Sequence, residues 1–176
     1  MKSRQLLLAI ASFLGIGAVG VLTYAELHHW QLQHSTDEAR FIKGINPQPS
    51  PTGFYAGLVP GLQKPSWQGK RFDAQTASGV NIFIDNGRQT MKFPFRTSSG
   101  AGSLNPNLRV LRIDYNNPHN PWWLRLFLDE VVAIEPGQLL GKLSIRLIPG
   151  HPYAILFFEL RQSNIHKMAS THQLKN

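Results

Sequence analysis

Residues 80–95 have the sequence VNIFIDNGRQTMKFPF, and this stretch indicates the fold class. At its centre, Asn86-Gly87 tolerates the positive φ angles of a type I′ turn, which joins two antiparallel strands tightly. Apolar side chains repeat with the period of two that is typical of strands. Val80, Ile82 and Ile84 share one face before the turn, and Met91, Phe93 and Phe95 share one face after it. We therefore predict a β-hairpin that pairs residues 80–85 with residues 90–95.

The same alternation continues towards the carboxyl terminus. Residues 111–115 and 138–148 alternate apolar with polar side chains, as strands with one solvated face do. The turn sequences Pro136-Gly137 and Pro149-Gly150 flank the second of these segments. Residues 122–134 and 153–160 carry apolar side chains on both faces, so we expect both of their faces to be covered. Together, residues 122–134, 138–148 and 153–160 predict a three-stranded meander.

The number of predicted strands indicates how the sheet is arranged. We expect one strand near each of Phe54, Lys70, Ile82, Phe93, Leu111, Leu126, Leu143 and Phe157. About eight antiparallel strands can close into an up-and-down barrel that encloses side chains or one small ligand, and closure leaves no free sheet edge. We therefore predict an all-β, eight-stranded barrel over residues 53–162. A β-sandwich, or an open curved sheet that holds a helix, is the alternative.

Three short motifs resemble those of the lipocalins and the wider calycin group of barrels. Gly53-Phe54-Tyr55 is similar to the Gly-x-Trp that opens lipocalins, although Tyr55 replaces the tryptophan. Asp114-Tyr115 is similar to their Asp-Tyr corner, and Arg161 lies where they often place an arginine over the opening aromatic residue. Trp67-Gln68-Gly69 offers a second Trp and Gly pair. The resemblance implies a cup-shaped barrel for a small apolar molecule.

Length and composition limit the possible classes of protein. A chain of 176 residues with 42% hydrophobic and 16% charged residues is long and apolar enough for one folded domain. The net charge of +8 is spread along the sequence rather than gathered in blocks, so we expect no nucleic-acid partner. The chain has no cysteine, which excludes disulfides, thiolate metal sites and a cysteine nucleophile.

The amino-terminal segment, residues 1–25, predicts export from the cytoplasm. Lys2 and Arg4 precede an uncharged, apolar run over residues 5–25, long enough to span a bilayer with the amino terminus in the cytoplasm. The remainder would then lie outside, in the periplasm or at the cell exterior. The alternative is a signal peptide cleaved near Ala25, which would release a secreted protein.

Residues 26–52 are predicted to link this segment to the barrel. Ser35 and Glu38 have the spacing of a helix amino-terminal cap, and Gly44 would end that short helix. Prolines at alternate positions over residues 46–51 indicate an extended linker. We interpret His28, His29 and His34 as solvated side chains of a stalk rather than as metal ligands, and we expect neither a metal nor a cofactor. Residues 163–176 are polar and predict a disordered tail.

Catalytic candidates are few. Asp114, Tyr115 and His119 lie close together in sequence, and an aspartate with a histidine performs acid–base chemistry where the two converge. The segment around His119 also has the composition of a plain turn. The small-residue loop over residues 98–103 has amides that could hold an anion, but it lacks the lysine of a phosphate-binding loop. We name no catalytic residue beyond these three candidates.

Candidate ligand-binding residues come from the polar faces of the strands. Arg112, Arg125, Lys142 and Arg146 share strands with Asp114 and Asp129. If they point into the barrel, they would bind a carboxylate or phosphate head, and Trp122 and Phe157 would contact an apolar tail. If they point outwards, they form ordinary surface ion pairs. Trp122, Trp123 and Phe127 could alternatively form a patch that faces a membrane or a partner, or pack in the core.

Three functional hypotheses follow from these observations. The first is an exported, membrane-tethered barrel that binds a lipid-like or other apolar small ligand without catalysis. The second is an assembly protein of the cell envelope with a solid barrel core and a protein partner. The third, which we rank last, is an enzyme that acts on a lipid-like substrate in the barrel mouth.

Overall fold

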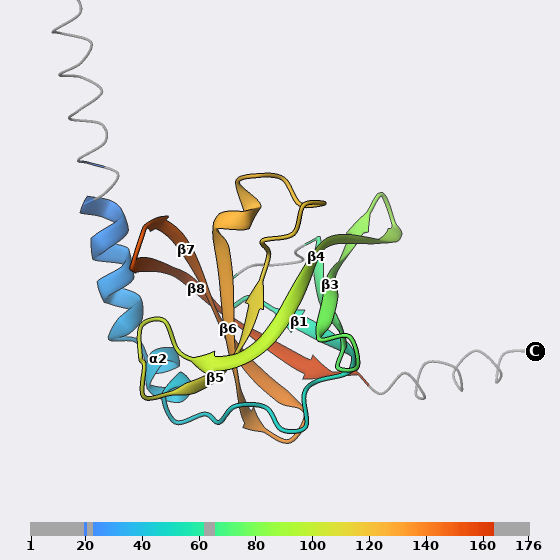
Figure 1. The fold of residues 1–176 in the computed structure, drawn as a ribbon, viewed down its shortest axis with the longest axis horizontal. Helices are drawn as coiled ribbons and strands as arrows, with labels where there is room; N and C mark the ends of the chain where they lie inside the picture. Colours follow the sequence, from blue (N-terminus) through green and yellow to red (C-terminus); the bar gives the residue numbers. More distant parts are fainter. Residues whose placement is uncertain (1–19, 21–22, 62–65, 164–176) are drawn as a thin grey trace, which may run out of the picture.

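The computed structural model describes residues 20, 23–61 and 66–163. These residues form a closed barrel in which each strand pairs antiparallel with the next and β8 pairs with β1 (Figure 1). The strands are β1 (Gly53–Leu58), β2 (Trp67–Asp73), β3 (Ser78–Asp85), β4 (Arg88–Ala101), β5 (Arg109–Asp114), β6 (Phe127–Glu135), β7 (Gln138–Ile148) and β8 (His151–Gln162). The predicted eight-stranded antiparallel barrel is confirmed, and the sandwich and the open sheet are wrong.

The hairpin of β3 and β4 forms as predicted. Asp85 pairs with Arg88, and Asn86 and Gly87 have φ angles of 49° and 75°, as a type I′ turn requires. The face of β3 that lines the barrel interior carries Asn81 and Phe83, whereas Ile84 on the other face is 38% exposed. Polar Asn81 therefore lies inside the barrel.

The predicted strand over residues 122–134 begins later than expected. Residues 122 and 123 belong to the loop after β5, residues 124–126 form the 3-10 helix η1 (Leu124–Leu126), and β6 starts at Phe127. The Arg125 guanidinium donates hydrogen bonds to the carbonyls of Asn120 and Pro118, which folds this segment back on its own loop instead of along β7. Both tryptophans therefore lie in a loop.

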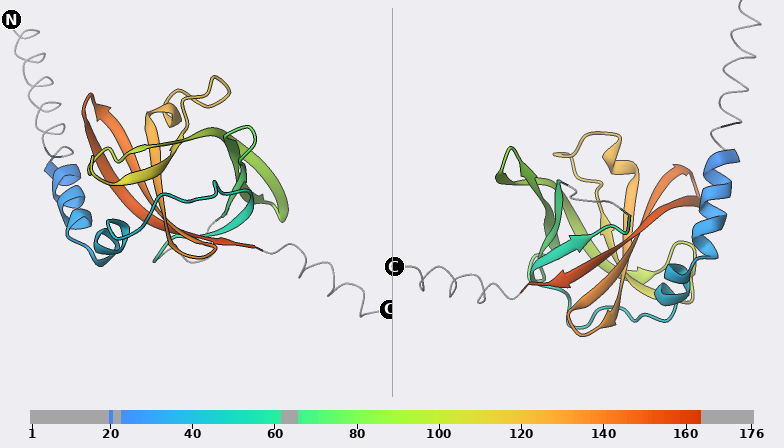
Figure 2. Two further views of the ribbon diagram at one scale, coloured as in Figure 1. Left: turned by 60° about the horizontal axis from the view of Figure 1, so that its bottom comes forward. Right: turned by 180° about the vertical axis from the view of Figure 1, so that it is seen from behind.

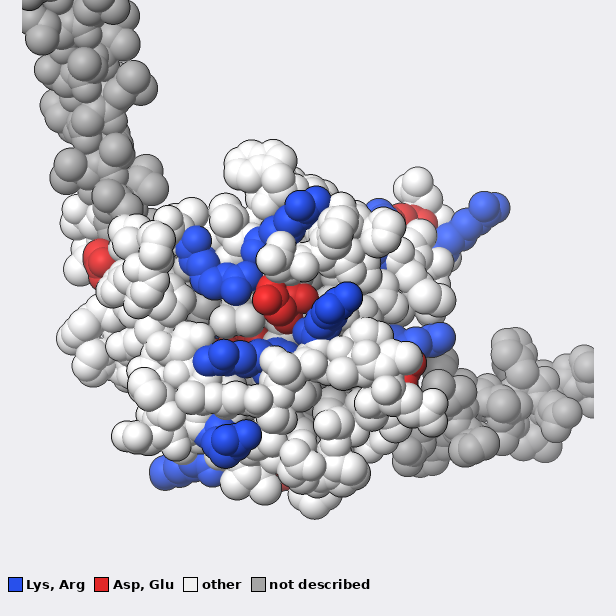
Figure 3. Space-filling model, in the orientation of Figure 1, with Lys and Arg blue, Asp and Glu red and all other residues white. Residues whose placement is uncertain are grey.

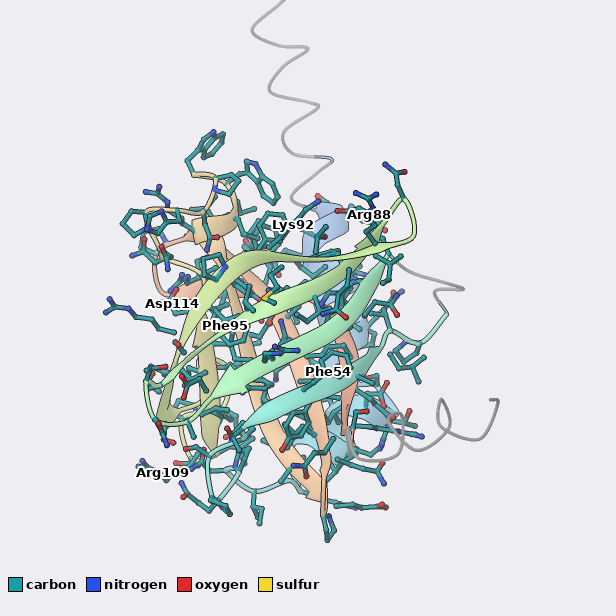
Figure 4. All side chains as sticks on the ribbon, turned by 90° about the vertical axis from the view of Figure 1, so that its right-hand side faces the viewer. Phe54, Arg88, Lys92, Phe95, Arg109 and Asp114 are labelled. Carbon is teal, nitrogen blue, oxygen red and sulfur yellow. The ribbon has the colours of Figure 1, made fainter. Side chains whose placement is uncertain are left out.

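The two ends of the barrel differ. At one end, which we call the mouth end, lie the turns at residues 86–87 and 149–150 and the loop over residues 115–126. At the other, the closed end, lie the turns at residues 74–77 and 136–137 and the loop over residues 102–108. Figure 4 shows Arg88 and Lys92 towards the mouth end and Arg109 at the opposite end. Packed side chains fill the interior towards the closed end: Tyr55, Phe72, Phe95, Leu111, Ile113, Val131, Leu139 and Leu160.

Two helical segments cover the outside of the barrel. Residues 23–33 are helical and lie beside β7 and β8, followed by α2 (Thr36–Phe41) (Figures 1 and 2). Ser35 Oγ accepts a hydrogen bond from the Glu38 backbone N–H at 3.1 Å, which confirms the predicted cap. A second apolar cluster holds these helices against the barrel wall: Phe41, Val110, Val132, Leu140 and Phe157, with Leu32, Leu108 and Ile134 beside them.

The histidines of the predicted stalk are not simply solvated. His29 is buried, and its Nδ1 accepts a hydrogen bond from the Ala154 backbone N–H at 2.9 Å. His28 Nε2 lies 2.7 Å from the Ile155 carbonyl oxygen. The interpretation of His28 and His29 as solvated is therefore wrong, because the helix that carries them packs against β8.

The linker over residues 46–51 lies against the closed end of the barrel. Ile45 forms an isolated bridge with Ala133, and Asn46 Nδ2 donates to Ser99 Oγ at 3.2 Å. Pro47 and Pro51 are buried. The chain therefore passes from the mouth end down the outer wall and beneath the closed end before it enters β1.

The predicted anchor or signal segment, residues 1–25, lies outside the described residues except for Gly20 and residues 23–25. The predicted tail lies outside them as well, apart from Ser163. Within the described part of the chain, no helix combines the length and the apolar character needed to cross a membrane.

Candidate functional site

A cavity of about 340 Å³ occupies the barrel interior towards the mouth end. Its wall is mostly aromatic and aliphatic, with contributions from Val59, Trp67, Phe83, Phe93, Trp123, Leu124, Phe127, Leu143, Leu156 and Phe158. Its polar lining comes from four residues on β2, β3, β6 and the loop after β5: Lys70, Asn81, Tyr115 and Asp129. The cavity therefore has apolar walls and one polar group of side chains.

These four residues, which we call the polar floor, form one hydrogen-bonded network. The Lys70 ammonium lies 2.9 Å from Asp129 Oδ2 and donates to Asn81 Oδ1 at 2.9 Å. It also donates to the Tyr115 hydroxyl, which in turn donates to Asp129 Oδ2 at 2.8 Å. The Lys70 and Asp129 side chains are 3% and 2% exposed. An ion pair thus lies inside the barrel, where each charge depends on the other for compensation.

Aromatic rings surround the same ammonium group. Lys70 Nζ lies between 5.2 and 5.5 Å from the ring centroids of Trp67, Phe95, Tyr115 and Phe158. A cation over an aromatic face is attracted by the ring quadrupole, and this attraction grows when water is excluded. The cage therefore adds to the attraction of Asp129 and stabilises the charged form of Lys70.

Two irregularities of the sheet aim the site residues inwards. The pairing of β2 with β3 shifts between Trp67 and Gly69, and Gly69 has a φ of 133°. Phe93 has a φ of 59°, a conformation that is rare for a bulky residue, at the register shift between β3 and β4. Asn81 Nδ2 donates to the Phe93 carbonyl at 3.1 Å. Such bulges re-aim side chains, and here they place Trp67, Lys70 and Phe93 in the cavity lining.

Glycines on the interior face make room for the aromatic rings. A Cβ atom at Gly57 would lie 2.4 Å from the Trp67 ring, and one at Gly141 would lie 2.2 Å from the Phe158 ring. Larger residues at these positions would displace rings of the Lys70 cage. The cavity therefore depends on small residues of β1 and β7 as much as on the rings themselves.

Burial changes the acid–base behaviour of the floor. Desolvation lowers the pKa of Lys70 below its usual 10.5, and the Asp129 carboxylate opposes that shift. Desolvation and the neighbouring Asp129 charge raise the pKa of the Tyr115 hydroxyl well above 10. Tyr115 therefore stays protonated and donates to Asp129 throughout the physiological range.

The network leaves Lys70 no lone pair for nucleophilic chemistry. Its three ammonium protons point to three oxygen atoms, those of Asp129, Asn81 and Tyr115. A nucleophilic lysine must instead present a neutral amine to its substrate. The floor is therefore not arranged for nucleophilic attack, and its hydrogen bonds are made within the network itself.

The four cations predicted for ligand binding lie outside the cavity lining. Arg112 donates to the Ala101 carbonyl, and Arg125 binds the carbonyls of its own loop. Arg146 pairs with Asp114 at 3.0 Å. Lys142 lies on the outer wall beneath α2, where it contacts Glu38 at 2.9 Å. Of the two alternatives, the outward-pointing one fits this geometry.

The two apolar residues predicted for ligand binding are also absent from the cavity lining. Trp122 is 75% exposed at the mouth end. Phe157 belongs to the outer cluster with Phe41, where the two ring centroids lie 6.0 Å apart. Of the predicted aromatic patch, Trp123 and Phe127 do line the cavity. A ligand-binding role for the six predicted residues stays a prediction that the cavity does not support.

The structure does not bring the three catalytic candidates together. Asp114 points outwards to Arg146, Tyr115 lies in the polar floor, and His119 is exposed in the loop after β5. The predicted small-residue loop over residues 98–103 is largely strand, since β4 continues to Ala101. One of its amides does bind an anion, because the Ser103 N–H donates to the Glu130 carboxylate at 2.6 Å.

Sequence reasoning missed Lys70, Asn81 and Asp129 as site residues. A usable signal was present: Asp129 shares a strand face with the apolar Phe127 and Val131, and Lys70 shares one with Phe72. A charged residue on the apolar face of a strand needs a partner across the barrel.

The resemblance to lipocalins holds at the level of architecture. The closed antiparallel barrel is compatible with a calycin-like fold, and Tyr55 lies inside it with its ring centroid 5.5 Å from that of Phe72. Arg161 is instead exposed and pairs with Glu159 at 3.2 Å. The described residues contain no group of three or more histidine, aspartate or glutamate side chains placed to hold a metal ion. No family model, curated protein or solved structure matches the chain.

Proposed function

We propose that this protein is an exported, membrane-tethered barrel that binds a small, largely apolar molecule in the cavity. The observation that carries the proposal is the cavity itself, with aromatic and aliphatic walls above one buried polar floor. Ligand sites have this composition, in which apolar walls supply burial and a few polar groups fix orientation. The ligand would lie with its apolar part against the walls, and any polar group that it carries would face the floor.

The size of the cavity limits the ligand. A volume of about 340 Å³ is near the lower end of the range of small-molecule sites, roughly 300–1,000 Å³. Packed side chains fill the interior towards the closed end, so a ligand cannot extend through the barrel. The bound part is therefore one compact molecule, or the end of a longer one that projects from the mouth.

Titration with a neutral apolar fluorophore, N-phenyl-1-naphthylamine, tests the proposal. We would compare the full chain in amphipol with Leu156→Trp, which fills the cavity, and with Leu147→Trp, which adds the same ring at a position that is 51% exposed. Wild type and Leu147→Trp should show one saturable site, and Leu156→Trp should lose it. The amphipol background is common to all three samples.

Equal binding by all three proteins would overturn the proposal. Leu143→Phe is a second cavity-filling variant that should also lose the site, should Leu156→Trp fail to fold as judged by circular dichroism. A barrel interior that is already filled by side chains would instead fit the second hypothesis, the envelope scaffold. The enzymatic hypothesis gains no support from the structure, because Asp114 and His119 lie outside the cavity.

A further inference from the structure

We propose that the mouth end of the barrel docks on a phospholipid bilayer, so that the cavity opens towards the membrane. This inference rests on the proposed function in one respect, the use of residues 5–25 as an anchor. It adds the orientation of the barrel on the membrane and the source of the ligand. The ligand would be a molecule dissolved in the membrane rather than in the aqueous phase.

The first reason is where the chain reaches the barrel. Residues 23–25 end the apolar run of the sequence and begin the described helix over residues 23–33. One turn later, Glu26 Oε1 lies 3.3 Å from His151 Nε2, next to the turn at residues 149–150. The helix therefore starts at the level of the mouth and descends along the wall (Figures 1 and 2). An anchor that ends at Ala25 would hold the mouth close to the bilayer surface.

The second reason is the distribution of exposed apolar side chains on the barrel. Within residues 53–162, the exposed large hydrophobic residues described by the structure lie in turns, loops or strand ends towards the mouth: Leu58, Ile84, Met91, Trp122, Trp123, Leu147 and Ile148. The helical segments and the linker outside the barrel expose Tyr24, Leu27, Trp30, Ile42 and Ile45 as well. Trp122 is 75% exposed and Leu147 is 51% exposed. Apolar side chains gathered at one end mark an interaction surface, and tryptophan favours the interface between lipid and water.

The third reason is charge at the same end. Arg88 is exposed at the tip of the hairpin of β3 and β4 (Figure 4). Arg125 binds only backbone carbonyls within its loop. Neither arginine has a carboxylate within ion-pair distance in the described part of the chain, so both keep an uncompensated charge. Basic residues next to apolar ones are attracted to anionic phospholipids, whereas a neutral apolar rim would fit a protein partner equally well.

The mouth surface and the cavity share a residue. Trp123 is 46% exposed and also lines the cavity, where its ring packs against Phe93 and Phe127. A bilayer in contact with Trp122 would therefore cover the opening of the cavity. Apolar molecules could pass from lipid to cavity wall without crossing water.

Site-directed fluorescence quenching tests this orientation, and the absence of native cysteine makes single labelling simple. The full chain carrying Trp122→Cys or Ile148→Cys, each labelled with bimane, would be reconstituted in vesicles of phosphatidylcholine and phosphatidylglycerol. Asn107→Cys is the matched control, because Asn107 is exposed in the loop at the closed end. A second set of vesicles contains lipids with a nitroxide near the top of the acyl chain.

We expect the nitroxide lipids to quench the labels at positions 122 and 148 and to leave the label at 107 bright. Equal brightness at all three positions would overturn the docking proposal, as would a full chain that does not associate with the vesicles. A protein partner at the mouth would give that same unquenched result. Naphthylamine binding, measured separately, can persist when docking fails, so failure of the two proposals is distinguishable. The two rim positions are independent, which covers the loss of one variant to misfolding.

Discussion

At the scale of single residues, the Lys70–Asp129 pair is the most demanding feature of the barrel. Both side chains are almost wholly buried, and each is compensated by the other and by the Tyr115 hydroxyl. Removing one partner from a buried pair leaves an uncompensated charge, which costs about 3–5 kcal/mol. A surface pair such as Lys92 with Asp85 has solvent to replace a lost partner.

Lys70→Met should therefore lower the free energy of unfolding by about 3–5 kcal/mol, measured by chemical denaturation. The double variant Lys70→Met with Asp129→Asn should regain much of that loss, since the isolated carboxylate charge is gone. Lys92→Met serves as the control and should unfold like the wild type. A Lys70→Met protein as stable as Lys92→Met would show that the pair does not have the assigned role.

At the scale of elements, the bulge at the start of β2 shows how local backbone shape builds the site. Gly69 has a φ of 133°, and a Cβ atom there would lie 2.0 Å from the Tyr55 carbonyl oxygen of β1. Gly87 in the hairpin turn also has a positive φ, of 75°, but a Cβ atom there would meet nothing within 4 Å. A substitution at Gly87 would therefore meet only the strain of a positive φ angle, whereas one at Gly69 would also meet steric overlap with β1.

Gly87→Ala should cost about 1–2 kcal/mol, which is the penalty of a left-handed conformation for a residue with a Cβ atom. Gly69→Ala should cost clearly more, because the β1–β2 pairing must also open to admit the methyl group. Urea denaturation of both variants measures the difference. Equal losses would mean that β1 moves aside without strain.

The packing of the helix over residues 23–33 depends on pH through His29. Burial is the main cause that lowers the pKa of His29 below 6.5, with His151 and Lys142 acting in the same direction and Glu26 and Glu38 opposing them. Because the unfolded chain binds this proton more readily, the stabilisation is fully present above pH 6.5. It is lost as the pH falls from 6.5 through the lower pKa of the folded state.

Hydrogen exchange of the Ala154 amide, which donates to His29 Nδ1, should therefore accelerate on acidification below pH 6.5, after correction for the intrinsic rate. His29→Asn keeps an acceptor at the equivalent position and removes the titration, so its Ala154 protection should change less over the same range. An identical pH profile in both proteins would show that protonation of His29 is not the cause of the change.

At the scale of the whole molecule, the sequence was sufficient for the architecture and insufficient for the site. The period of two, the Asn86-Gly87 turn and the strand count predicted the closed barrel because they are local signals. The polar floor joins residues from Lys70 to Asp129, and only the closure and register of the barrel bring these together. For the alternating cations Arg112 and Arg146 the sequence left two alternatives open, because pattern alone does not say which face of a strand lies inside the barrel.

Charged side chains of both signs lie on the face of the molecule shown in Figure 3. On the face shown in Figure 3, basic side chains surround a small acidic group near the centre and do not form one continuous basic area. The net charge of the full sequence is +8. Among the ion pairs of the described residues, Lys70 with Asp129 is the one in which both side chains are almost wholly buried.

The packed side chains towards the closed end have a consequence for the proposed ligand, because they leave the mouth end as its way into the cavity. A ligand would then enter and leave through the mouth, a passage that Trp123 lines. By microscopic reversibility, a change that obstructs this passage slows both directions by the same factor and leaves the equilibrium untouched. On the proposed function, the time that a ligand stays bound would depend on the rim and on the affinity together, whereas the affinity itself would depend on the walls and on the Lys70 network.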